Sequence, residues 1–192
     1  MKQEKSVEEK SHNKIKNKKD RETLSWFIIV VIITFIVSLS FSYLSTTSMN
    51  KLNIIPAILI LILVVLIGVV FDIMAIAVAV AEEHEFHAKA SKKARGAKIS
   101  LFMIKHSPKF AAVFADVIGD VCGVLSGAMS AILSFKIMQE FGLEFNLQFI
   151  ISALVASLTV GGKAIGKMLA QKNSTKIVHE IGKFVSLWKS EG

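Results

Sequence analysis

The sequence has 192 residues, 53% of them hydrophobic, with a mean hydropathy of +0.56 and a formal charge of +8. A soluble domain of this length could not bury so much apolar surface in one core, so a soluble protein is excluded. Cys122 is the only cysteine. This excludes an internal disulfide and any metal site built from several cysteines.

The chain opens with a lysine-rich polar tail, residues 1–23, for which we expect disorder or a loose helix. An apolar stretch follows and predicts a first membrane span over residues 24–45. The polar tail before this stretch and the lack of a clear cleavage signature after it favour a retained anchor over a cleaved signal peptide. We expect a short polar loop over residues 45–53.

A second apolar run begins at Ile54 and continues to Ala81, interrupted by Asp72. It is longer than a straight crossing needs, so it predicts a tilted, kinked or extended membrane helix. The stretch 82–109 is acidic at its start and basic in its middle, with apolar residues near a helical period. It predicts a hairpin of one or two amphipathic helices lying on the membrane surface.

Two further spans are predicted over residues 110–137 and 147–170, joined by a short polar loop. The tail, residues 171–192, carries apolar residues at helical spacing between lysines and predicts another surface-lying helix. We therefore expect a membrane core over residues 54–170, preceded by one extra span.

The basic residues alternate along the chain in a way that predicts topology. The N-terminal tail carries eight lysines and arginines, the stretch 82–109 seven, and the segment from Lys163 onward six, while only Lys51 and Lys136 lie in or next to the two short loops. The positive-inside rule places the three basic segments in the cytoplasm, so both termini are expected there. Basic segments between spans suit the anionic inner leaflet better than nucleic acid, which we do not expect as a partner.

Together these patterns predict an all-α integral membrane protein with about four transmembrane helices and additional juxtamembrane amphipathic helices. The apolar runs are too long and continuous for barrel strands. We also expect no enzymatic activity, because the sequence holds no nucleophile–base pair, phosphate loop or zinc motif.

Three carboxylates fall inside the predicted spans: Asp72, Asp116 and Asp120. An aspartate near the centre of a membrane helix costs about 2.5–3.5 kcal/mol on insertion scales, so it usually faces a cavity, a partner charge or an ion. Asp116 and Asp120 share one helical face. Two like charges in apolar surroundings need a cation between them to stay ionised, and hard oxygen ligands suit Mg²⁺ or Ca²⁺.

A plainer interpretation stays open for each aspartate. Asp116 could snorkel to the cytoplasmic interface, and one of the acids could pair with Lys163 or Lys167 as a counter-charge. Small residues surround Asp120 and predict close helix packing, and glycine there also permits a bent or locally unwound helix. The residues expected to pack are Gly119, Gly123, Ser126 and Gly127.

A second cluster, Glu83, His84, Glu85 and His87, has the donor types of a transition-metal site. A solvated juxtamembrane turn is the favoured interpretation of this cluster. His106 and His179 have no evident partners in the sequence.

Four segments, in order and spacing, resemble the transmembrane domain of the CNNM/CorB–CorC magnesium transporters, from Leu61 to about Lys183. The first lies where that family has an apolar helix with an F-S-G-x-E-x-A-type turn. The second resembles its basic helical hairpin, the third its I-G-N-x-x-x-N segment with one inserted residue, and the fourth a G-E-x-x-P-K-x-L-A-type stretch. In this sequence they read LIGVVFDIMAIAV, AKASKKARGAKISLFMIKHSPKF, VIGDVCGVLSG and GKAIGKMLAQKNSTKIV.

The resemblance implies a homodimer that binds a dehydrated Mg²⁺ through polar side chains and carbonyls. By position, Asp72 stands for the family's turn serine, and Asp120, beside Gly119, stands for its asparagine. Lys163 replaces a glutamate. No CBS pair follows the membrane domain in this sequence, so we do not expect the family's usual nucleotide regulation within it, and a separate cytoplasmic regulatory protein is a candidate partner.

Two further departures from the family pattern are Ala75, in place of the first-motif glutamate, and Gly166, in place of a proline. Two hypotheses follow. In the first, the chain transports a divalent cation, Mg²⁺ foremost, across the cell membrane, with Asp72 and Asp120 as ligands, Gly119 or a nearby carbonyl beside them, and Asp116 lining the approach. In the alternative it is a non-transporting scaffold or regulatory subunit, in which Asp120 pairs with Lys163.

Overall fold

A computed structural model describes residues 2–143 and 145–188 of the chain, and the side chains of residues 24–143 and 145–187. Within this part the protein is helical and has no strand. The chain divides into two units, residues 1–37 and 38–192. Residues 2–37 of the first unit belong to helix α1, and the rest of α1 and all other elements belong to the second unit.

Helix α1, Lys2–Lys51, is one continuous helix through the polar tail and the first apolar run. The expected loop over residues 45–53 is therefore wrong in extent, because only Leu52 and Asn53 separate α1 from α2. Small polar residues such as Ser45 and Thr46 suggest a loop, but neither is a glycine or proline that would stop a helix.

Helix α2, Ile54–Val80, matches the second predicted span closely. The predicted hairpin consists of α3, Glu83–Ser91, and α4, Ala97–Lys105. Gly96 precedes α4 with a φ of 78°, a left-handed conformation that a residue with a side chain rarely adopts. The glycine therefore makes the tight turn between the two short helices.

The third span is a single rod with a widened middle. It comprises α5, Ser107–Ala112, the π-helix η1, Val113–Gly119, and α6, Asp120–Phe141. Pro108 lies in the first turn of α5, where its missing N–H is not needed. In η1 the Asp120 N–H donates to the carbonyl of Ala115, five residues earlier, so the helix is widened rather than unwound.

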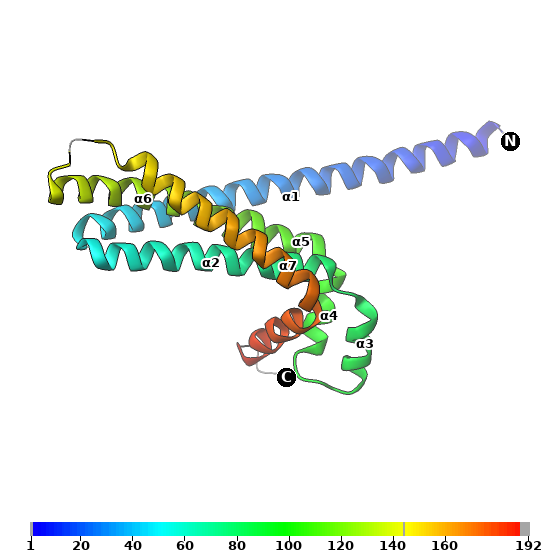
Figure 1. Ribbon diagram of the computed structural model, residues 1–192. Coiled ribbons are helices and arrows are strands. Elements are labelled where there is room, and N and C mark those ends of the chain that lie inside the picture. The colour runs from blue at the N-terminus through cyan, green and yellow to red at the C-terminus, as the bar shows by residue number, and fades with distance from the viewer. Residues whose placement is uncertain (1, 144, 189–192) are drawn as a thin grey trace. The chain divides into compact units, whose positions relative to one another are not determined.

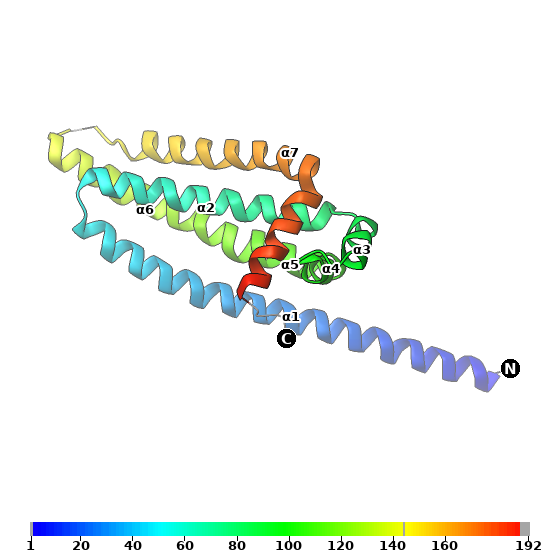
Figure 2. The same cartoon turned by 90° about the horizontal axis from the view of Figure 1, so that it is seen from below.

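Helix α7, Gln148–Trp188, contains both the fourth span and the predicted C-terminal helix. A break at Asn173, with φ of −124° and ψ of 25°, separates its two halves. The first half runs beside α2 and α6, and the second half turns away at the end that carries α3 and α4 (Figures 1 and 2).

Two apolar cores hold these helices together. The loop-end core lies toward the α1–α2 and α6–α7 loops, and includes Met49, Ala57, Leu61, Met129, Leu133 and Val155. The hairpin-end core joins the end of α2 to α3, α4 and the second half of α7, and includes Val78, Phe86, Met103, Ala170 and Val178. The amphipathic segments therefore pack on the bundle as well as facing outward.

Candidate functional site

A buried carboxylate lies between the two apolar cores. Asp72 of α2 is 8% exposed, eight residues before the end of its helix, which is about 12 Å along the axis. Its Oδ2 atom lies 2.6 Å from Nζ of Lys163 on α7. The two atoms form an ion pair, although Oδ2 has no aligned hydrogen-bond donor. Since an unpaired charge at this depth is costly, the pair neutralises both groups.

The other oxygen of Asp72 packs against the backbone of the π-helix. A Cβ atom added to Gly119 would lie 2.6 Å from Oδ1 of Asp72 and 3.4 Å from the carbonyl oxygen of Phe114. Only a glycine leaves room for the carboxylate here. Asp72 is thus enclosed by the widened turn of the third span on one side and by α7 on the other.

Glycines on α7 bring that helix close enough for Lys163 to reach Asp72. A Cβ atom at Gly162 would lie 2.9 Å from Val69, and one at Gly166 would lie 2.5 Å from Ile73, both on α2. These two glycines and the buried Ala170 recur every four residues, so they form one ridge along α7. The sequence carries this signal in GGKAIGKMLA, but we predicted close helix packing only for the small residues around Asp120.

The predicted packing residues have mixed outcomes. Gly119 does pack closely, against Asp72, and Ser126 is buried, with its hydroxyl donating to the carbonyl of Gly123. Gly123 and Gly127, in contrast, have open space where a Cβ would lie. Within one chain their predicted packing is therefore absent, and packing between copies stays a prediction.

Asp116 and Asp120 differ from the buried Asp72 in exposure and in contacts. Both are exposed, and neither side chain has a hydrogen bond or ion pair with another described residue. The expected pairing of Asp120 with Lys163 is wrong, because Lys163 contacts Asp72 instead. Asp120 follows Gly119 directly, so its side chain leaves the helix about 100° further round, which is away from the Gly119 face. Lys167, the other expected counter-charge, is exposed as well.

The juxtamembrane histidine cluster is solvated in the structure. Ligand atoms of Glu82, His84 and Glu85 lie within 4.8 Å of one another, and all three residues are exposed. Glu83 instead accepts a hydrogen bond from His87 at 3.0 Å and lies 3.5 Å from Lys105. The hydrogen bond to His87 and the nearby Lys105 hold the pKa of Glu83 below its usual value.

These features define a class. The described residues include four helices long and apolar enough to cross a membrane, so the chain is an all-α, multi-pass membrane protein with an ion pair buried between its helices. No family model, curated protein or solved structure matches the chain. The likeness to CNNM/CorB–CorC transporters therefore stays a prediction that rests on the four motifs in the sequence.

Proposed function

We propose that this protein transports a divalent cation, Mg²⁺ foremost, across the cell membrane. The observation that carries the proposal is the buried Asp72 carboxylate, enclosed by the π-helix at Gly119 and paired with Lys163. A carboxylate in a helical bundle, beside a widened helix turn, offers hard oxygen ligands of the kind that Mg²⁺ takes.

Lys163 occupies the position where a bound cation would neutralise Asp72. Its long, flexible stem lets the ammonium group move without a change in the helices. The proposed cycle alternates between Asp72 paired with Lys163 and Asp72 bound to the transported ion. Lys163 then acts as a tethered competitor that keeps the carboxylate neutralised when no ion is present.

Apolar cores lie on both sides of Asp72 along the bundle. The loop-end core lies on one side, and the hairpin-end core, with Val78, Phe86 and Val178, lies on the other. The hairpin-end core is built from α3, α4 and the second half of α7, so a movement of these juxtamembrane helices would open the path from that side. In the proposed function these helices couple the inner membrane surface to the opening of the ion path.

Exposed Asp116 and Asp120 favour an assembled state. A carboxylate on a lipid-facing surface is costly, and a second copy that covers this face would remove the cost. The proposal therefore includes a homodimer. It also places both termini in the cytoplasm and includes a separate cytoplasmic regulatory protein as a further partner. In this state Asp116 and Asp120 would line the approach of the ion rather than bind it alone.

A non-transporting scaffold or regulatory subunit is the second candidate. The same ion pair favours it, because Lys163 already neutralises Asp72 and leaves no net charge for an ion to balance. In that function the pair would hold α2 and α7 together and would never separate.

Flux measurements distinguish the two functions. The full chain is reconstituted in liposomes that contain a Mg²⁺-sensitive dye, together with the variants Asp72→Asn and Glu140→Gln. The exposed Glu140 is a matched control far along α6 from the site. We expect uptake by the wild type and by Glu140→Gln, and a loss of at least about tenfold, or 1.4 kcal/mol, in Asp72→Asn. Wild-type liposomes that behave as empty ones would support the scaffold instead.

A further inference from the structure

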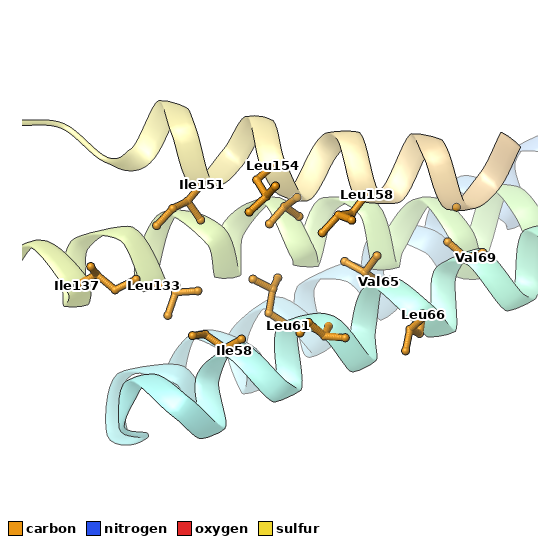
Figure 3. Close-up of a pocket in the computed structure, with 13 residues that line it drawn as sticks. Ile58, Leu61, Val65, Leu66, Val69, Leu133, Ile137, Ile151, Leu154 and Leu158 are labelled. Atoms are coloured by element: carbon orange, nitrogen blue, oxygen red, sulfur yellow. The ribbon is translucent and has the colours of Figure 1, made fainter. Parts of the chain in front are cut away.

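A pocket opens between α2, α6 and α7 in the loop-end half of the bundle. Its volume is about 420 Å³. Thirteen residues line it, none of them charged, and they are Ile58, Leu61, Ile62, Val65, Leu66, Val69, Leu133, Ile137, Ile151, Leu154, Val155, Leu158 and Gly162. In Figure 3 the side chains of α2 and α7 face each other across an open space, with Leu133 and Ile137 of α6 at one end.

The size of the pocket restricts what can fill it. A helix with its side chains is about 10–12 Å wide, so this volume would hold only about one turn of a neighbouring helix. A cavity of about 150 Å³ lined by apolar side chains binds one benzene, so the pocket has room for roughly 16–18 carbons. A single hydrocarbon chain fits both limits.

The length and depth of the pocket agree with one leaflet of a bilayer. From Ile58 to Val69 the lining follows α2 for eleven residues, or about 16 Å. Half of the hydrocarbon core of a bilayer is about 15 Å. Every lining residue belongs to a candidate membrane span, so acyl chains are the solvent that meets this pocket.

A lysine next to the pocket lining in the sequence reaches the α1–α2 loop. Lys136 precedes the lining residue Ile137, and its Nζ donates to the carbonyls of Asn50 at 3.1 Å and Leu52 at 2.5 Å. The exposed Lys51 lies between these two residues in the sequence. An ammonium group at the level where the α1–α2 loop meets the headgroups suits a lipid phosphate.

We propose that the α2–α6–α7 pocket binds one acyl chain of a bilayer phospholipid, from the leaflet on the side of the α1–α2 loop, with its phosphate near Lys136. The opposite end of the pocket is Gly162, the residue before Lys163. The bound chain therefore packs against the wall of α7 that carries the buried ion pair. This site is independent of whether the protein transports ions.

Native mass spectrometry tests the site. The full chain is placed in nanodiscs of equal parts phosphatidylglycerol and phosphatidylcholine with palmitoyl and oleoyl chains, and is then released in the spectrometer. We expect one phospholipid retained per wild-type chain. Val65→Trp, which fills the pocket from α2, should reduce retention at least fivefold. Leu63→Trp, on the exposed part of α2 outside the pocket, should leave it unchanged.

A second pair of variants guards against misfolding. Leu158→Trp enlarges a side chain that lines the pocket on α7, and Val160→Trp, at similar exposure but outside the lining, is its control. Circular dichroism verifies that each variant is helical. No retained lipid on the wild type, equal retention in filled and control variants, or a free fatty acid in place of a phospholipid would overturn the proposal.

Discussion

At the scale of single residues, two neighbours allow Asp72 to be buried in the helical bundle. Lys163 supplies the charge, and Gly119 supplies the space for the carboxylate. Sequence alone identifies Asp72, because a charge within an apolar run stands out. Sequence alone cannot identify its partner. Any of Asp72, Asp116 and Asp120 could face Lys163, because the sequence does not give the rotation of each helix about its axis.

Gly119→Ala should disturb the buried pair directly. The added methyl group would lie 2.6 Å from Oδ1 of Asp72, so the carboxylate has to move away from the π-helix. We expect a loss of about 1–3 kcal/mol in stability, measured as a lower thermal midpoint in detergent. Gly123→Ala, where a Cβ meets open space, should stay within about 0.5 kcal/mol of the wild type. Equal effects of the two changes would refute the close contact.

Removal of the charge at Lys163 should also destabilise the fold. Lys163→Met leaves Asp72 buried without a partner, and Lys167→Met removes an exposed lysine one turn away. Breaking a fully buried pair costs about 3–5 kcal/mol, and the one-third exposure of Lys163 should reduce that figure. Chemical unfolding of the two variants measures the difference, and an unchanged Lys163→Met would mean that the pair contributes no stability.

At the scale of elements, α7 does two jobs along its length. Its first half packs its glycine ridge on α2, and its second half, beyond Asn173, packs on the hairpin. The sequence predicts both halves from their composition. It divides them between residues 170 and 171, close to the break at Asn173 but not at that residue.

A close contact joins the second half of α7 to α4. A Cβ at Gly182 would collide with Oγ of Ser100, a buried hydroxyl whose single proton is shared between the carbonyls of Gly96 and Val178. Gly182→Ala should therefore loosen the hairpin and make the exposed turn at Lys93 more mobile. We expect trypsin to cleave the variant there at least severalfold faster than the wild type. A Cβ at Gly161 meets open space, so trypsin should cleave Gly161→Ala at the wild-type rate. Unchanged cleavage in Gly182→Ala would contradict the clamp.

The hairpin should respond to acid through Glu83. The folded pKa of Glu83 is below its usual value because His87 donates to it and Lys105 is near. Its stabilising effect is present above the unfolded pKa and is lost as the pH falls through the folded pKa. Tryptic cleavage of α3 and α4 only samples neutral pH, so pepsin digestion across the acid range is the measurement. Pepsin cleavage of the hairpin should increase as the pH falls through the folded pKa of Glu83, and this increase should be absent in Glu83→Gln.

At the scale of the whole molecule, the sequence predicts the all-helical fold and the number of candidate spans because bilayer thickness sets helix length. The π-helix and the two-core arrangement could not be predicted in the same way. The two-core arrangement depends on contacts between residues far apart in the chain, such as Val78 and Val178.

Four crossings place the two ends of α2 on opposite sides of the membrane. In a Cys122→Ser background, a maleimide that cannot cross membranes should label Glu140→Cys in intact cells. The same reagent should label Ser91→Cys only after permeabilisation. Labelling of both positions from the same side would contradict the predicted topology, and unmodified Cys122→Ser protein is the blank.

The central claim is that Asp72 exchanges between Lys163 and a divalent cation. Mn²⁺ binding by electron paramagnetic resonance, with Mg²⁺ as competitor, tests it on purified wild type, Lys163→Met and Asp72→Asn. We expect at least tenfold tighter binding in Lys163→Met, with a Mn²⁺-dependent rise in its thermal midpoint, and no binding in Asp72→Asn. Equal affinity in all three proteins would contradict it.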